Sequence, residues 1–265
     1  MDSIEKLIIY YNKSEKGDIY HKVVECMLKN IHEIKDVTIY ELADLCYSSP
    51  ATISRLVKRL EFENYTDFKT QINYALKNYH YFNMNTRDVE LVNNEDIVPF
   101  YFNFLMNNMM ALKNNIKYEQ ISKISDALYH AEETKFFGST EIPMHILQKA
   151  MVVTRKRAGI YKDIVSQENS LENIKEGSVV FAAIPNLIEM APIRSILKKA
   201  KNKGAYIITI CSGETNEYQK YSDIQINFEG TKTSMDIYMF MVIVNLIKYD
   251  YCHRYVDDFL EDMYS

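Results

Sequence analysis

The sequence predicts two domains of different fold class, an all-α domain at the N-terminus and a doubly wound α/β domain with a five-stranded parallel sheet at the C-terminus. Apolar residues recur at helical spacing through residues 1–78, whereas from residue 134 short apolar strand segments alternate with helical ones. Between these regions, the Asn- and Tyr-rich residues 79–94 show no steady period and are typical of a linker. We therefore place the domains at 1–78 and 95–265.

The composition limits what kind of protein this is. The chain has 265 residues, of which 47% are hydrophobic and 25% charged, as is usual for a soluble globular protein with room for two cores. Its net charge of −5 attracts no nucleic acid globally, so a DNA contact needs a local basic face. The most apolar window, residues 237–247, is shorter than the roughly 18 residues of a membrane span, and the N-terminus lacks a signal-peptide pattern. We expect a cytoplasmic protein without a membrane segment.

The cysteines and histidines indicate neither a disulfide framework nor a metal site. Cys26, Cys46, Cys211 and Cys252 are scattered without a C-x-x-C pair, and the histidines show no zinc-binding spacing. The glycine-rich signatures of nucleotide-binding loops are also absent from the sequence. We expect four buried thiols in a reducing cytosol, with no metal and no cofactor.

Two capped helices are predicted within residues 38–60. Thr38 suits the cap of the first helix, with Glu41 three residues later as its capping-box partner. Ser49 suits the cap of the second helix, and Pro50 stands at its first position, where a missing N–H costs nothing. This layout is that of a helix-turn-helix. The buried stripe of the second helix is expected at Ile53, Leu56, Val57 and Leu60.

The opposite face of this second helix carries hydroxyls near its start and cations toward its end, with no acid. Such a face suits a helix whose N-terminal part enters the major groove of DNA. An ordinary amphipathic helix with a solvated basic face is the alternative, and the capped helix pair favours DNA reading. The candidate DNA-binding residues are Ser49, Ala51, Thr52, Ser54, Arg55, Lys58, Arg59 and Lys69.

Residues 14–76 resemble the N-terminal domain of RpiR-type transcriptional regulators. The matching residues are Glu41, Leu42, Ala43, Ser49, Ala51, Thr52, Arg55, Leu60, Phe62, Tyr65, Phe68 and Lys69. The resemblance implies binding to a double-stranded operator, with the aromatics of the tail packed under the basic helix and Lys69 near a phosphate. Two positions depart from the pattern, because Tyr47 in the turn and Glu61 after the second helix stand where glycine is usual. A side chain costs stability there if the backbone has a positive φ.

In the C-terminal domain, doubly apolar strands predict a parallel sheet covered on both faces, with a ligand site at the carboxyl ends of the strands. The strand segments are 134–138, 158–163, 178–184, 205–211 and 222–228. The helical segments are 95–116, 118–133, 141–156, 192–204 and about 234–260.

Residues 134–230 resemble a SIS (sugar isomerase) domain, through "FFGSTEI", "IKEGSVVFAAIPN" and "AKNKGAYIITIC" followed by "YSDIQINF". The resemblance implies a sugar-phosphate site in a Ser/Thr-rich turn after the third strand. Here that turn reads Ala183-Ile184-Pro185-Asn186, which has no hydroxyl, and Pro185 also lacks an N–H. The remaining effector-binding candidates are Gly138, Ser139, Thr140, Asn186, Ser212, Thr215, Thr231 and Thr233.

Together these features predict a transcriptional regulator of sugar or amino-sugar metabolism, and not an enzyme. It would bind an operator as a homodimer or homotetramer and sense a phosphosugar or amino-sugar effector. One alternative is a sugar-phosphate isomerase with an accessory N-terminal domain, for which Glu141, His145 and Glu214 are the acid–base candidates. The other is a DNA-binding protein whose SIS-like domain binds no ligand and only dimerises.

Overall fold

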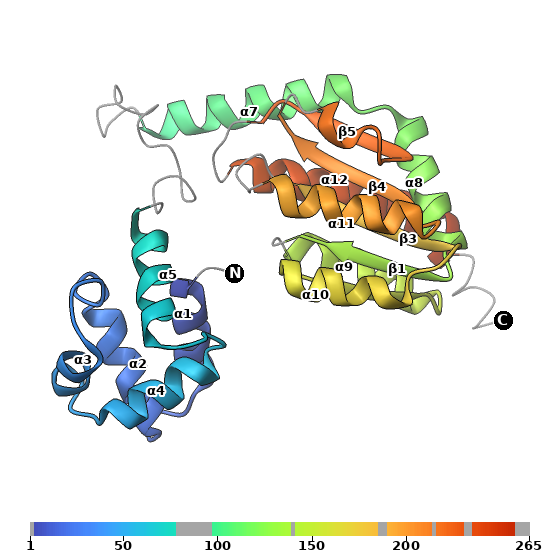
Figure 1. Cartoon of the computed structure of the whole chain (residues 1–265). Coiled ribbons are helices and arrows are strands. Elements are labelled where there is room, and N and C mark those ends of the chain that lie inside the picture. Colours follow the sequence, from blue (N-terminus) through green and yellow to red (C-terminus); the bar gives the residue numbers. More distant parts are fainter. Residues whose placement is uncertain are drawn as a thin grey trace. The chain divides into compact units, whose positions relative to one another are not determined.

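The computed structural model describes residues 3–77, 97–138, 141–184, 190–213, 216–230 and 235–257. The chain forms two compact units, residues 1–81 and 82–265 (Figure 1). Within the described ranges, no helix is long and apolar enough to cross a membrane.

The N-terminal unit is entirely helical, as predicted. Its helices are α1 (Ser3–Lys13), α2 (Ile19–Lys29), α3 (Ile39–Leu45), α4 (Pro50–Arg59) and α5 (Tyr65–Lys77). They enclose one apolar core to which all five helices contribute. The aromatics after α4 belong to this core, since Phe62 and Phe68 are buried and meet edge to face at 5.1 Å between ring centroids. The expected packing of the tail against the basic helix is therefore confirmed.

Local capping fixes the two helices of the helix-turn-helix, also as predicted. The Thr38 hydroxyl accepts from the backbone N–H of Glu41 at 3.3 Å, and the Glu41 carboxylate accepts from the N–H of Thr38 at 2.6 Å. Ser49 caps α4 by accepting from the N–H of Thr52 at 3.1 Å. Each cap satisfies a donor that the first helical turn leaves unpaired, so the start of each helix is set by a few adjacent residues.

Among residues 3–77, two hold a left-handed backbone without being glycine. Tyr47 has a φ of 48° and Glu61 a φ of 63°, and these are the two positions where the sequence departs from the usual glycine. Each costs about 1 kcal/mol relative to glycine, because Cβ crowds the carbonyl oxygen in this conformation. The turn and the end of α4 therefore require glycine-like geometry from residues that adopt it poorly.

A disulfide corrects the expectation of four free thiols. Cys26 in α2 is bonded to Cys46 at the C-cap of α3, with 5.5 Å between the two Cα atoms. Cys211 and Cys252 are free thiols. The spacing rule failed because the pair is joined by the crossing of two helices, which no short sequence motif records.

The C-terminal unit is built on a five-stranded parallel sheet in the order β2-β1-β3-β4-β5, which confirms the predicted doubly wound α/β fold. The chain moves outward from β1 to β2 and then returns to β3 on the other side of β1. The order therefore reverses between β1 and β3, where open α/β sheets place their ligands. The strands are β1 (Glu133–Phe137), β2 (Arg157–Tyr161), β3 (Ser178–Ile184), β4 (Tyr206–Ser212) and β5 (Ile224–Phe228).

Helices cover both faces of this sheet (Figure 1). One apolar cluster joins one face to α7, α8, α9 and α12, and a second joins the other face to α11 and the segment after α10. The sequence did not predict α10, a short helix started by Asp163. The helices are α7 (Ile97–Asn115), α8 (Tyr118–His130), α9 (Glu141–Val153), α10 (Ile164–Ser170), α11 (Met190–Asn202) and α12 (Met235–Tyr251), and a π-helical turn follows at Cys252–Val256.

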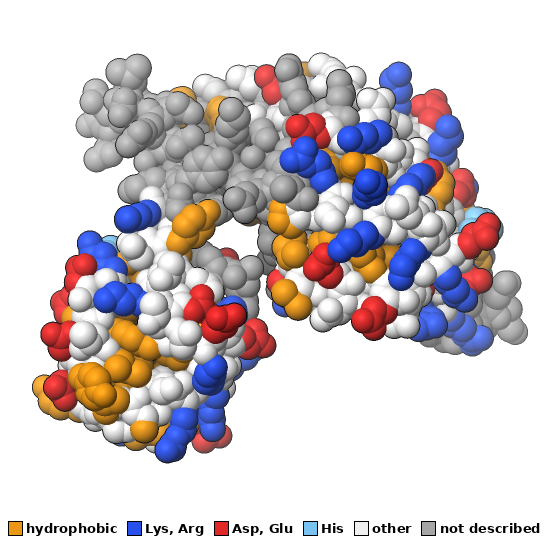
Figure 2. All heavy atoms as spheres, in the orientation of Figure 1, with side chains coloured by type: hydrophobic (Ala, Val, Ile, Leu, Met, Phe, Trp, Pro, Cys, Tyr) orange, Lys and Arg blue, Asp and Glu red, His pale blue; other side chains and the backbone are white. Residues whose placement is uncertain are grey.

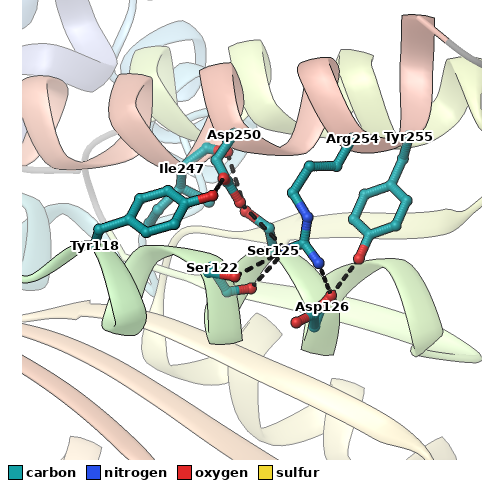
Figure 3. A network of polar contacts seen from close by, with 8 residues as sticks. All are labelled: Tyr118, Ser122, Ser125, Asp126, Ile247, Asp250, Arg254 and Tyr255. Carbon is teal, nitrogen blue, oxygen red and sulfur yellow. Dashed lines mark hydrogen bonds and ion pairs between the residues drawn. The ribbon is translucent and has the colours of Figure 1, made fainter.

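A polar network ties this π-helical turn to α8 (Figure 3). The Arg254 guanidinium donates to Asp126 Oδ1 at 2.6 Å and to the Ser122 carbonyl at 3.1 Å, and the Tyr255 hydroxyl also donates to Asp126. Nearer the start of α8, the Tyr118 hydroxyl donates to Asp250 at 3.0 Å. The hydrogen bond from Tyr255, aided by Arg254, lowers the pKa of Asp126, while burial and the Asp126 carboxylate raise the pKa of Tyr255 to about 12. The network joins α8 to the end of α12 and to the π-helical turn that follows it.

Candidate DNA-binding surface and effector site

Helix α4 presents one buried and one exposed face. Ile53, Leu56 and Val57 are fully buried in the core of the N-terminal unit. The opposite face carries the exposed residues Ala51, Ser54, Arg55, Lys58 and Arg59. Figure 2 shows Lys and Arg side chains gathered at the lower right of this unit, over α4. The structure therefore places five candidates of α4 on one exposed face of the helix, and Thr52 is half-buried beside them.

The hydroxyls at the start of α4 are engaged with each other. The Ser49 and Thr52 hydroxyl oxygens lie 2.9 Å apart, in addition to the cap bond from the Thr52 N–H. Both hydrogen bonds lie on the exposed side of the helix. This pair orients the first turn of α4 and places polar atoms at the N-terminus of the helix.

The three cations of α4 are held differently. Lys58 Nζ donates to the backbone carbonyl of Glu63. The Arg59 guanidinium lies 4.3 Å from the ring centre of Tyr20, and a hydrogen bond with Tyr10 raises its pKa. Arg55 is exposed, and the described part of the chain offers it neither a hydrogen bond nor an ion pair. Arg55 is thus the cation of α4 most available to a partner outside the chain.

Lys69 lies apart from this surface. It belongs to α5, and its Nζ donates to the Val37 carbonyl at 3.0 Å, which also accepts from the Tyr65 hydroxyl at 3.1 Å. The Val37 carbonyl directly precedes the cap of α3. Lys69 therefore joins α5 to the start of the helix-turn-helix in this structure, and its contact with a phosphate stays a prediction.

Of the predicted effector-binding residues, Gly138 and Ser212 are described. Ser139, Thr140, Asn186, Thr215, Thr231 and Thr233 lie outside the described residues. Gly138 directly follows β1 and has a φ of 154°, and a Cβ there would lie 2.8 Å from Met144 Cε and 3.1 Å from the Ala183 carbonyl oxygen. Glycine is required at this position because β3 and α9 approach its backbone so closely. Gly138 therefore lies directly beside the end of β3.

Residues at the carboxyl ends of β4 and β5 lie close together. Ser212 ends β4 and is buried, and the N–H of Gly213 donates to the Phe228 carbonyl of β5 at 2.8 Å. A Cβ on Gly230 would lie 2.9 Å from the Gly213 nitrogen and 3.2 Å from Asp236 Oδ2. Sequence reasoning missed Asp236, a carboxylate in the first turn of α12 that is only 1% exposed. The sequence could have indicated this residue, because Asp236 is an acid in the predicted helix that follows the last predicted strand.

The end of β3 is apolar up to the last described residue. Ala183 and Ile184 are both buried and belong to opposite faces of the sheet, and Pro185 and Asn186 lie outside the described residues. The residues that end β3 therefore supply methyl and alkyl groups where hydroxyls are usual in SIS domains.

Comparisons with known proteins concern the N-terminal domain and the fold of the C-terminal unit. Residues 3–79 match the model of the helix-turn-helix domain of the rpiR family. An uncharacterized HTH-type transcriptional regulator from Caldanaerobacter subterraneus subsp. tengcongensis is 22% identical over 212 residues, which are 77% of this chain and 73% of the relative.

Two solved structures share the fold. The Vibrio vulnificus NanR protein, complexed with ManNAc-6P, matches with a TM-score of 0.53 at 15% identity, over 99% of this chain and 96% of that chain. The sugar isomerase domain of an RpiR transcription factor from Sphaerobacter thermophilus matches with a TM-score of 0.51 at 14% identity, over 62% of this chain and 94% of that chain. Residues 3–79 are therefore identified as a helix-turn-helix domain of the rpiR family, and the C-terminal unit shares the fold of a sugar isomerase domain.

Proposed function

We propose that the protein is a transcriptional regulator that binds an operator through α4 and senses a phosphosugar-like metabolite through its C-terminal unit, in the cytoplasm. The exposed face of α4 is the observation that carries the DNA-binding part. It combines a hydroxyl-bearing N-terminus with three exposed cations on a helix whose other face is fixed in the core. Hydroxyls and small residues at the start of the helix suit base edges, and the cations suit phosphates.

The test begins with selection of duplexes from a random-sequence pool by the wild-type protein. The double variant Arg55→Ala with Lys58→Ala is expected to weaken binding to the selected duplex at least about 100-fold, because two charged contacts are lost. Its thermal unfolding is expected to be unchanged, since both side chains are exposed. Normal affinity in this variant would refute α4 as the reading helix.

A matched control keeps the net charge of the variant the same. Lys123 and Lys198 are exposed on α8 and α11 of the other unit. Replacing both with alanine removes two positive charges, as the test variant does, and should change affinity by less than about threefold. An equal loss in the control would mean that general charge, and not the face of α4, determines binding.

For the effector, the proposal rests on the carboxyl edge of the sheet. The order of the strands reverses between β1 and β3, and at this edge Gly138 directly follows β1 while Ser212 ends β4. The NanR structure with the same fold is complexed with ManNAc-6P, which favours a phosphosugar or amino sugar here as well. The buried carboxylate of Asp236 near this edge suits a hydroxyl or amino group of the effector better than its phosphate, because like charges repel strongly where water is excluded.

A thermal-shift screen tests this part. Phosphosugars and amino sugars are compared at equal concentration, and a ligand at 100 times its Kd is expected to stabilise the C-terminal unit by about 2.7 kcal/mol. Glucose 6-phosphate and glucosamine serve as probes that separate the phosphate from the amino group. No stabilisation by any compound, together with intact binding to the selected duplex, would favour a C-terminal unit that only dimerises.

We also propose that the protein acts as a homodimer or homotetramer. Along α7, exposed apolar side chains recur every four residues at Val98, Phe102, Met106 and Met110. A stripe of this kind is typical of a helix that packs against another protein surface. Light scattering on the variant Phe102→Glu with Met106→Glu is expected to give a smaller oligomer than the wild type, and an unchanged mass would exclude α7 as the interface.

A further inference from the structure

Tyr47 combines a left-handed backbone with a side chain that is 98% exposed. Its backbone is fixed by the turn, because its own N–H donates to the Asp44 carbonyl at 3.1 Å and the N–H of Ser48 donates to the Ala43 carbonyl at 2.8 Å. These bonds close the end of α3 in the way that usually places glycine in the left-handed position. The conformation is therefore set by the turn and not by the tyrosine.

No contact in the described part of the N-terminal unit offsets the cost of this side chain. The ring lies in water, so it gains no burial, and its Cβ disfavours the backbone that it must adopt. Glu61 holds the other left-handed position of the helix-turn-helix, and its carboxylate lies 3.5 Å from Lys6 Nζ. Residues with a strained backbone are concentrated at functional sites. The question is therefore what the exposed Tyr47 side chain can contact outside the chain.

The position of Tyr47 identifies that contact. It stands two residues before Ser49, the cap of α4, in the turn that leads into the helix. In a helix-turn-helix complex the start of the second helix enters the major groove, so the turn before it faces the sugar–phosphate strand at the edge of the groove. Tyrosine hydroxyls are among the usual donors to phosphate oxygens.

We propose that Tyr47 is a DNA-positioning residue whose phenolic hydroxyl donates to a phosphate oxygen of the operator beside the groove that α4 enters. This inference rests on the proposed function and adds a contact that is neither a cation nor part of α4. A phosphate is favoured over a base edge because Tyr47 lies outside the helix, ahead of the cap. Because the hydroxyl is neutral, the contact releases no counterion.

The experiment measures affinity for a duplex selected by the wild-type protein, at several salt concentrations. Tyr47→Phe removes only the hydroxyl and is expected to weaken binding about tenfold, with an unchanged slope of log K against log salt. Arg55→Ala is expected to reduce that slope by about one, because a cation is lost. Tyr47→Gly should bind at least as weakly as Tyr47→Phe although it unfolds at a higher temperature, since glycine relieves the backbone strain.

Tyr74→Phe provides the matched control, because Tyr74 is 62% exposed on α5 of the same unit. It should bind like the wild type. Affinity of Tyr47→Phe within twofold of the wild type, or an equal loss in Tyr74→Phe, would overturn the proposal. A loss confined to the selected duplex and absent on random-sequence DNA would replace the phosphate contact with base reading. Failure of the wild type to select any duplex would refute the proposed function itself.

Discussion

The two units of this protein build their candidate sites in opposite ways. In the N-terminal unit, the candidate DNA-binding face lies on one helix, whose start is fixed by Ser49 and whose inner face is fixed by the core. In the C-terminal unit, the described candidates lie at the carboxyl edge of the sheet, where Gly138 follows β1 and Ser212 ends β4. A site on one capped helix depends on local sequence, whereas a site at a sheet edge depends on how distant strands are brought together.

Reduction of the disulfide should have the largest effect on stability, and we expect this effect in the N-terminal unit only. Cys26 and Cys46 close a loop with a sequence separation of 20, so reduction is expected to lower the stability of the N-terminal unit by about 3 kcal/mol. Amide hydrogen exchange on the intact chain, with and without reductant, resolves the two units. Protection should fall in α2 and α3 and remain unchanged in β3 and β4. Equal losses in both units would show that the units unfold together.

Gly138→Ala tests the opposite unit. The new Cβ would meet the Ala183 carbonyl and Met144 at the edge where β1 and β3 lie side by side, so we expect a loss of about 2 kcal/mol in the C-terminal unit. Urea unfolding measures the change, and operator affinity is the control because α4 is untouched. Gly17→Ala is the matched substitution, since a Cβ there meets no atom within 4 Å. An equal cost at Gly17 would contradict the close-approach argument.

Ser49→Ala measures how far local capping supports the reading helix. It removes the acceptor of the Thr52 N–H and is expected to destabilise the N-terminal unit by about 1 kcal/mol. Ser54→Ala is the control, because Ser54 is exposed within α4, where alanine is a better helix former. Thermal unfolding should show a lower midpoint for Ser49→Ala alone. A similar midpoint in both variants would mean that packing, and not the cap, fixes the start of α4.

Glu61→Gly should have the smallest effect and the opposite sign. Glycine adopts the left-handed backbone at the end of α4 without strain, but it also loses more backbone entropy on folding than glutamate does. Because the relief of strain is the larger of the two effects, we expect the unit to become more stable by about 0.5 kcal/mol. Glu61→Ala keeps the Cβ and removes the carboxylate, so it should give no gain. If both variants stabilise the unit equally, the charge of Glu61 and not its backbone is the unfavourable feature.

The sequence predicted most of what local rules determine. The caps at Thr38 and Ser49 and the five strands follow from residue type and spacing, so they are found where expected. The Cys26–Cys46 bond and the buried carboxylate of Asp236 escaped prediction, because each results from elements that meet only after folding. The six effector candidates outside the described residues stay predictions, as does the phosphate contact of Lys69.

The network in Figure 3 has a consequence for how such proteins are put together. Arg254 and Tyr255 reach Asp126 across 128 and 129 positions of the chain, which fastens the π-helical turn after α12 to α8. These contacts join distant parts of the sequence within the C-terminal unit. A chimera that joins residues 97–257 to a different rpiR-family helix-turn-helix domain is therefore expected to keep the proposed effector response and to bind the operator of that other domain.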